Sequence, residues 1–201
     1  MPRMQDSLYR SRGFVMIAGT DEAGRGPWAG PVYAAAVILP ERVRLPGLDD
    51  SKKINEATRE KLFPFIQEQA IAWCIASASV EEIDTLNIRE ASFLAMKRSL
   101  EGLGSIPDLV LSDGFKIPNY HLPNEGVVKG DGKLRCIAAA SILAKVARDR
   151  YMHVQHELYP AYNFAKHKGY GTPEHQEALR KHGICEIHRK SFAPIKLLNV
   201  Q

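Results

Sequence analysis

The sequence has 201 residues, of which 45% are hydrophobic and 25% charged, the balance of an ordinary globular chain of one domain or one domain with a small appendage. No apolar run approaches roughly 20 residues and the three cysteines are far apart, which argues against a membrane span and a disulfide framework. The first residues have no apolar h-region, so we expect no secretory signal in them. The net charge of +4 divides into −3 over residues 1–131 and +7 over residues 132–201, which favours an acidic part that holds metal followed by a basic part that holds a polyanion.

The N-terminal stretch predicts a loose tail, residues 1–13, followed by a short buried strand over residues 14–18. Two adjacent acids, Asp21 and Glu22, come directly after this strand. Charges at the end of a buried strand are costly unless a cation or a partner neutralises them, so the pair indicates a metal site. The open alternative at this point is a hairpin turn with two solvated acids at its tip.

A glycine-rich turn follows the acids, with Gly24, Gly26 and Gly30 allowing a tight turn and a close approach of the backbone to a ligand. The turn lacks the Gly-Lys-Ser/Thr ending of a P-loop and the Gly-x-Gly-x-x-Gly pattern of a dinucleotide fold, which argues against both. Residues 31–39 predict a second strand antiparallel to the first.

A helix from Asn55 or Thr58 to about Gln69 is predicted next, although Pro64 lies inside the pattern. Residues 71–77 then predict a third strand. Ser79 and Glu82 have the spacing of a capping box, and residues 88–103 predict an amphipathic helix.

Two further short strands each lead into an acid: residues 109–111 precede Asp113, and residues 126–129 precede Asp131. Neighbouring parallel strands place their carboxyl ends at one edge of a sheet, so we expect these acids to meet Asp21 and Glu22 there. The alanine-rich residues 134–159 predict a long helix, and Asp131 acting only as its cap is the alternative.

The C-terminal part predicts a helix from Thr172 to Gly183, preceded by a basic aromatic loop, residues 166–171. Tyr170, flanked by glycines, would present its ring to a sugar or base, or else pack the loop onto the domain. Histidines in this part are expected at the surface or as caps: His167, His175 and His188. Basic residues are candidates for phosphate contacts: Lys52, Lys53, Lys166, Lys168 and Arg189.

Four converging carboxylates suit Mg²⁺ or Mn²⁺, which prefer oxygen ligands, better than zinc, because no His or Cys spacing of a zinc site is present. Two such ions can activate a water and stabilise a leaving oxygen in phosphoryl transfer. The sequence therefore favours a metal-dependent enzyme acting on a phosphodiester.

Six stretches together resemble the ribonuclease HII (type 2 ribonuclease H) family: GTDEAGRGPWAGPV, LDDSKKI, DLVLSDG, VVKGDGKLRCIAAASILAKVARDR, HKGYGT and HRKSFAPI. The resemblance covers residues 17–198. It implies an α/β fold with a ribonuclease H-like five-stranded mixed sheet, whose first three strands are antiparallel, flanked by helices and followed by a small helical C-terminal part. We accordingly expect a tail over 1–13, a catalytic domain over 14–160 and a helical part over 161–201 that contacts nucleic acid.

The resemblance also implies an activity: endonucleolytic cleavage on the 5′ side of ribonucleotides in RNA/DNA hybrids and in duplex DNA with embedded ribonucleotides, leaving 3′-hydroxyl and 5′-phosphate ends. Catalytic and metal-binding roles fall to Asp21, Glu22, Asp113 and Asp131, with two Mg²⁺ or Mn²⁺ ions. Substrate-binding roles fall to Gly24, Arg25, Gly26, Lys52, Lys53 and Tyr170. We expect a cytoplasmic monomer; a ribonuclease HIII-like or integrase-like nuclease and a binding module with structural acids are the alternatives.

Overall fold

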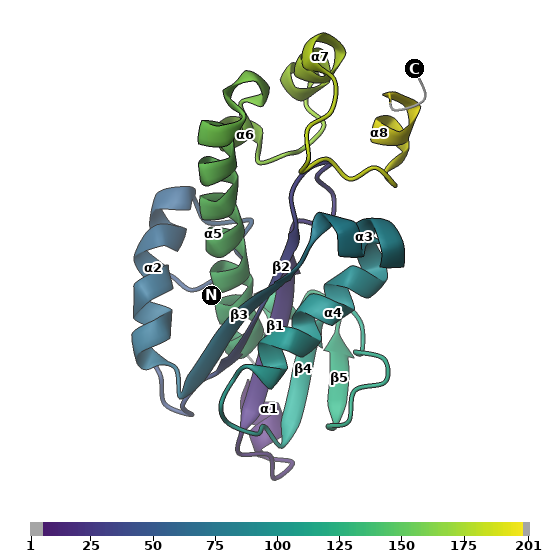
Figure 1. The fold of residues 1–201 in the computed structure, drawn as a ribbon. Coiled ribbons are helices and arrows are strands. Elements are labelled where there is room, and N and C mark those ends of the chain that lie inside the picture. The colour runs from purple at the N-terminus through teal and green to yellow at the C-terminus, as the bar shows by residue number, and fades with distance from the viewer. Residues whose placement is uncertain (1–5, 199–201) are drawn as a thin grey trace.

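The structure, a computed structural model, describes residues 6–198 and is built around a five-stranded mixed sheet (Figure 1). The strands are β1 Ile17–Ala23, β2 Val32–Ile38, β3 Ala72–Ala78, β4 Leu109–Asp113 and β5 Asn124–Val127. They lie in the order β3-β2-β1-β4-β5. β1, β2 and β3 are antiparallel, whereas β4 is parallel to β1 and β5 is parallel to β4. The predicted mixed sheet, with its first three strands antiparallel, is confirmed.

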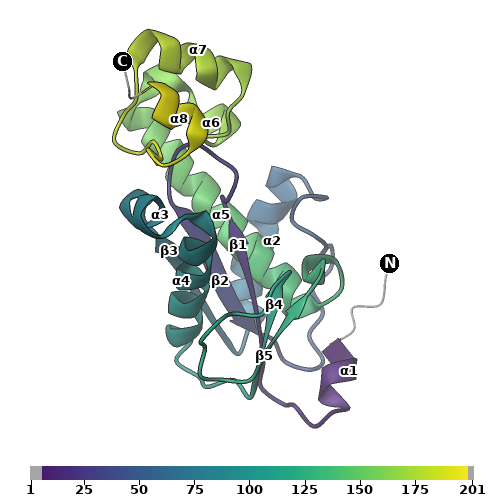
Figure 2. The ribbon, with the colours of Figure 1, turned by 90° about the vertical axis from the view of Figure 1, so that its right-hand side faces the viewer.

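Helices cover both faces of the sheet. The helices of the described residues are α1 Asp6–Arg10, α2 Glu56–Gln69, α3 Val80–Leu86, α4 Ile88–Glu101, α5 Arg135–Leu158, α6 Phe164–His167, α7 Pro173–His182 and α8 Ala193–Leu198, with 3-10 turns at Gly130–Gly132 and Pro160–Tyr162. α5 and α2 lie on one face, α4 lies on the other, and α6, α7 and α8 gather beyond the far end of α5 (Figures 1 and 2). Within residues 6–198, no helix combines the length and apolar character required to cross a membrane.

Helix starts follow local signals in the sequence. The Asn55 side chain caps α2 by accepting a hydrogen bond from the Thr58 N–H at 2.9 Å, and Pro64 lies inside the helix without ending it. Ser79 and Glu82 form the reciprocal capping box that begins α3. The caps predicted at these two positions are therefore confirmed.

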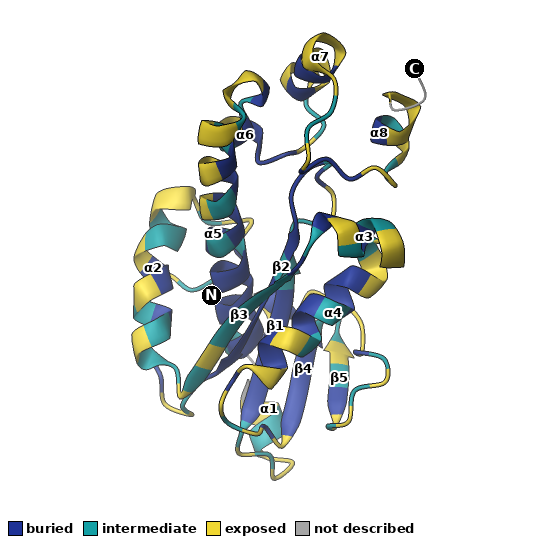
Figure 3. Ribbon diagram, in the orientation of Figure 1, coloured by how far each residue is buried: buried dark blue, intermediate teal, exposed yellow. Residues whose placement is uncertain are grey.

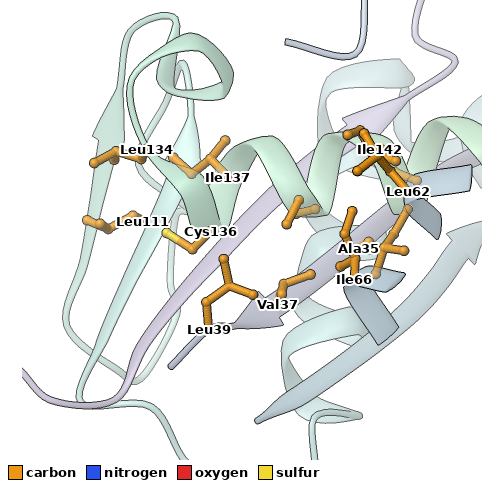
Figure 4. Packing of buried hydrophobic residues seen from close by; sticks show 14 of the residues in the cluster. Ala35, Val37, Leu39, Leu62, Ile66, Leu111, Leu134, Cys136, Ile137 and Ile142 are labelled. Atoms are coloured by element: carbon orange, nitrogen blue, oxygen red, sulfur yellow. The ribbon is translucent and has the colours of Figure 1, made fainter. Parts of the chain in front are cut away.

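The central strand β2 is buried on both faces (Figure 3). Its side chains alternate: Ala35 and Val37 pack toward α5, whereas Ala34, Ala36 and Ile38 pack toward α4. The α5 side of the core is drawn in Figure 4 with Leu62, Ile66, Leu111, Leu134, Ile137 and Ile142. A separate apolar cluster joins α6, α7 and α8 to the end of α5.

Three expectations about element limits are wrong. The first strand does not end at residue 18, because pairing with β2 continues to Ala23 and both Asp21 and Glu22 lie within it. The last strand covers residues 124–127 rather than 126–129. Residues 1–5 lie outside the described residues, but residues 6–10 form helix α1 rather than a loose tail, and Arg12 forms a 2.8 Å ion pair with Glu125.

Candidate active site

Three carboxylates from distant parts of the chain meet at one edge of the sheet. Asp21 lies in β1, Asp113 ends β4, and Asp131 lies in the 3-10 turn after β5. β1 and β4 are parallel with Thr20 opposite Ser112, so the next residue of each strand is an aspartate at the same edge. Each of the three side chains offers an oxygen, and these oxygens lie within 4.8 Å of one another. Asp131 does not cap α5, because Leu134 holds the cap position.

Glu22 lies beside this group. It borders the same pocket as Asp21, and its Oε1 atom lies 3.3 Å from an Nη1 atom of Arg25. Asp21 is only 3% exposed. The interpretation of these two residues as solvated acids at the tip of a hairpin is therefore wrong.

The acids border a pocket of about 380 Å³. Eight of the residues predicted for the site line it: Asp21, Glu22, Gly24, Arg25, Gly26, Lys52, Asp113 and Tyr170. Asp131 reaches this region through Lys52, whose Nζ lies 3.2 Å from its Oδ2. Lys53 instead faces Asp49 and Asp50, at 3.5 and 3.9 Å. The pocket thus combines acids, a glycine turn, one lysine and an aromatic ring.

Electrostatic repulsion is concentrated at the acids. Burial, followed by the charges of Glu22 and Asp113, raises the pKa of Asp21 well above its usual range. Burial also raises the pKa of Glu22, and burial together with Asp113 raises the pKa of Asp131. Burial alone would lower the pKa of Lys52, but the charges of Asp131, Asp21 and Asp50 together raise it. A divalent cation would relieve this repulsion, and an all-oxygen donor set fits a hard ion such as Mg²⁺ or Mn²⁺.

One face of α5 supplies pocket residues that the sequence reasoning missed. Ser141, Lys145 and Arg148 line the pocket at successive turns of the helix. Ser141 lines the pocket beside Asp21, and its Oγ lies 2.7 Å from that of Ser51. The available signal was the appearance of polar side chains at i, i+4 and i+7 in an otherwise alanine-rich helix.

The glycine turn packs against the guanidinium of Arg148. Gly24 has φ +98°, and a Cβ at this position would lie 2.0 Å from Nε of Arg148, so only glycine fits. Arg148 donates to the carbonyls of Ala29 and Pro31 on the far side of the turn, at 3.1 and 3.2 Å. The backbone of the turn is therefore held by this buried arginine, which also lines the pocket.

Three basic residues suggested as phosphate contacts have other partners. Arg189 is fully buried and donates to carbonyl groups of the glycine turn, and Lys168 is 8% exposed and hydrogen-bonded to His153 at 2.9 Å. Lys166 forms a 2.8 Å ion pair with Glu174. The suggestion is wrong for Arg189 and Lys168, because folding of the C-terminal part buries both side chains.

Tyr170 stands at the rim of the pocket, 47% exposed, with its ring beside Gly26. The next residue, Gly171, is pressed against Trp28, where a Cβ would lie 2.1 Å from the indole. The loop is thus packed by its glycine, which leaves the tyrosine ring available to a ligand.

The three histidines expected at surface or capping positions, His167, His175 and His188, are buried, so that expectation is wrong. His175 and His188 are both 0% exposed, and their Nε2 atoms lie 3.0 Å apart. Nδ1 of His175 hydrogen-bonds to the Tyr170 carbonyl at 2.9 Å. The rings of His167 and His175 are stacked, with their centroids 4.6 Å apart. Burial lowers the pKa of both His175 and His188 to about 4. These buried rings therefore form the protein side of the Tyr170 loop and hold it through the Tyr170 carbonyl.

A mixed sheet with three clustered aspartates at the carboxyl ends of parallel β1 and β4 and after β5 defines a metal-dependent nuclease of the ribonuclease H class. The model of one family within this class, Ribonuclease HII, matches residues 18–195. The chain belongs to the ribonuclease HII family.

Comparisons with individual proteins agree. The chain is 57% identical over 183 residues to the Ribonuclease HII of Idiomarina loihiensis, covering 91% of this chain and 98% of that protein. The crystal structure of ribonuclease H2 from Pyrococcus horikoshii superposes with a TM-score of 0.77 at 26% identity, over 92% of this chain and 97% of that one. The ribonuclease HII of Archaeoglobus fulgidus, solved in complex with PCNA, gives a TM-score of 0.73 at 27% identity. The superposition covers 87% of this chain and 93% of that one. The protein is a metal-dependent endoribonuclease that acts on RNA paired with DNA.

Proposed function

We propose that the protein hydrolyses the phosphodiester on the 5′ side of a ribonucleotide, both in RNA/DNA hybrids and at single ribonucleotides embedded in duplex DNA, leaving 3′-hydroxyl and 5′-phosphate ends. The observation that carries this proposal is the shared pocket, in which the acids lie next to the glycine turn Gly24–Gly26. A backbone turn is suited to the ribose 2′-hydroxyl, the group that distinguishes RNA from DNA.

Asp21, Glu22, Asp113 and Asp131 would hold two Mg²⁺ or Mn²⁺ ions. The chemistry supplied by such a pair is activation of a water and stabilisation of the leaving oxygen. The acids would hold these ions beside the scissile phosphate at the carboxyl ends of β1 and β4, where Ser141 of α5 also lines the pocket. The mutual repulsion of the buried acids supports this role, because it is relieved only by bound cations or protons.

The remaining predicted residues would bind substrate. Lys52 is positioned by Asp131 and carries a raised pKa, so it is charged at neutral pH and can contact a phosphate. Arg25 lines the pocket and Lys53 lies beside Asp49 and Asp50, and their charges would add to salt-dependent binding. The half-exposed Tyr170 would stack on the deoxyribose next to the ribonucleotide.

The helical part over residues 161–201 would extend the nucleic-acid contact, supported by the net charge of +7 over residues 132–201. We also propose that the protein works as a monomer in the cytoplasm. Its free cysteines support a reducing compartment.

Cleavage of an end-labelled DNA duplex containing one ribonucleotide tests the proposal, with an all-DNA duplex of the same sequence as control. We expect one product, cut 5′ to the ribonucleotide, in Mg²⁺ or Mn²⁺ and no product in chelator. Cutting that persists in chelator would contradict the metal mechanism, and cutting 3′ to the ribonucleotide or in the all-DNA control would contradict the specificity. Binding without any cutting would indicate a binding module.

A further inference from the structure

Two arginines, Arg148 and Arg189, are buried at the back of the glycine turn, with 1% and 0% exposure. Neither forms an ion pair within 4 Å with an acid of residues 6–198. A buried guanidinium without a counter-charge is costly unless hydrogen bonds satisfy its donors. Each donates instead to three backbone carbonyls, and all of Arg189's acceptors lie in the connection between β1 and β2.

The acceptors of Arg189 fix the orientation of two peptide groups. Its guanidinium donates to the carbonyls of Gly24, Arg25 and Gly30, at 2.6, 3.0 and 2.8 Å. The peptide bonds are trans, so the C=O and the N–H of one peptide unit point in opposite directions. With the Gly24 and Arg25 carbonyls turned toward Arg189, the N–H groups of Arg25 and Gly26 are turned away from it.

These two N–H groups are free to bind a ligand. Within residues 6–198 neither has a protein acceptor, and Arg25 and Gly26 both line the pocket beside Asp21. We propose that Arg189 is a positioning residue for ribonucleotide specificity: it holds the turn so that the Arg25 and Gly26 N–H groups face the ribose 2′-hydroxyl. The proposal rests on the proposed function for the identity of that ligand.

Three sets of contacts fix the position of Arg189 and of the residues that follow it, so its guanidinium can hold the glycine turn in one orientation. Its own N–H donates to the Trp28 carbonyl at 2.8 Å. In α3, the Asp84 carboxylate accepts from the backbone N–H groups of Lys190 and Ser191, both at 2.9 Å, and from the Ser191 hydroxyl at 2.6 Å. The Phe192 ring lies 5.0 Å below the guanidinium. The segment after α7 therefore connects α3 to the turn that reads the ribose.

The test is Arg189→Lys, which keeps the charge but loses the planar fork that reaches three carbonyls. The readout is the ratio of dissociation constants for an all-DNA duplex and for the same duplex with one ribonucleotide, measured in chelator. We expect the ratio to fall about tenfold, as for loss of one hydrogen bond to the hydroxyl. Arg135→Lys is the matched control, because Arg135 also donates to two backbone carbonyls, those of Val43 and Glu41, but none of these three residues lines the pocket, so the wild-type ratio should be kept.

An equal loss of affinity for both duplexes would overturn the proposal, since it would show only a structural role. If Arg189→Lys does not fold, Asp84→Ala is the second variant, because Asp84 is partly exposed and its loss removes the hydrogen bonds that hold Lys190 and Ser191. It should also lower the ratio, and an unchanged ratio would overturn the proposal. If the wild-type protein shows no preference, the proposed function fails. The amide NMR signals of Arg25 and Gly26 then decide: a shift in Arg189→Lys but not in Arg135→Lys supports the positioning role, and no shift overturns it.

Discussion

Asp21 occupies a position where burial and two neighbouring carboxylates act in the same direction. Both raise the pKa of its carboxyl group, so in the metal-free native state ionised Asp21 opposes folding. The Glu22 N–H donates to its Oδ1 at 2.7 Å, a bond that an amide oxygen can also accept. The ionised Asp21 carboxylate therefore lowers the stability of the metal-free protein, and replacing it with the neutral, equally sized asparagine removes this destabilisation.

We expect Asp21→Asn to lower turnover at least about 1000-fold, because several kcal/mol of metal-dependent stabilisation are lost. The same change should raise the Tm of the metal-free protein, by about 2–4 °C for each 1 kcal/mol of repulsion removed. Cleavage assays and thermal unfolding in chelator measure the two effects. Asp108→Asn is the control: one oxygen of Asp108 accepts from the N–H groups of Val15 and Met16 before β1 and an amide oxygen can replace it, so activity should persist and Tm should not rise. A variant of Asp21 that still turns over would contradict the assignment.

Tyr170→Ala should reduce cleavage chiefly on duplexes with a single ribonucleotide, by about 10- to 100-fold, the effect of losing one stacked ring. Its ring is 47% exposed, so Tm should hardly change. Parallel assays on a single-ribonucleotide duplex and a long RNA/DNA hybrid measure the difference, and Tyr170→Phe should restore activity. An equal loss on both substrates would refute stacking on the deoxyribose.

Among the elements, α5 and β1 pack so closely that only a glycine, Gly19, fits at their contact. A Cβ on Gly19 would lie 2.3 Å from the Cys136 carbonyl carbon and 2.5 Å from the Ile137 nitrogen. These are backbone atoms and cannot rotate away. The close approach brings the α5 face with Ser141 and Lys145 over the end of β1, where the acids lie.

Gly19→Ala should accordingly lower the free energy of unfolding by about 3 kcal/mol, the cost of overpacking against backbone that cannot yield. Denaturant unfolding followed by circular dichroism measures it. Gly132→Ala is the matched control, because its Cβ would lie 3.7 Å from Lys53 Nζ, an ordinary contact. Equal stability of the two variants would show that α5 can move away from the sheet.

Elements with local signals could be predicted from the sequence, and elements decided by distant partners could not. Asn55 and the Ser79 capping box mark helix starts because cap and capped groups are neighbours in the chain. The end of β1 depends on its pairing with β2, and the charged pair Asp21–Glu22 obscured it. Burial of His188 and Arg189 depends on contacts with Trp28 and α7, which no local pattern reveals.

Over the whole molecule, lowering the pH has opposite effects on the stability of two regions. The carboxyl groups at the sheet edge have raised pKa values, so without metal this region gains stability as the pH falls through them. His175 and His188 have pKa values of about 4 against 6.5 for the free side chain. Their contribution is complete above pH 6.5 and is lost as the pH falls from 6.5 toward 4, by roughly 2 kcal/mol per histidine at pH 5.

We therefore expect the C-terminal part to loosen in acid before the sheet does. The ring NMR signals of His175 and His188 should stay constant from pH 7.5 to 5.5, and Trp28 fluorescence should change only at lower pH, since its ring lies 5.8 Å from His175. Trp73→Phe leaves Trp28 as the only tryptophan and so isolates the signal. Ring signals that titrate near pH 6.5 would contradict this prediction.

The position of β1 in the middle of the sheet has a consequence for synthesis on the ribosome. β1 leaves the exit tunnel first among the strands, but its parallel neighbour β4 begins at Leu109 and its covering helix α5 ends at Leu158. At translation rates of about 5–20 residues per second, the nascent β1–β2 hairpin waits on the order of ten seconds with one edge unpaired and an apolar face uncovered. A chaperone that binds nascent chains would meet this hairpin in every round of translation.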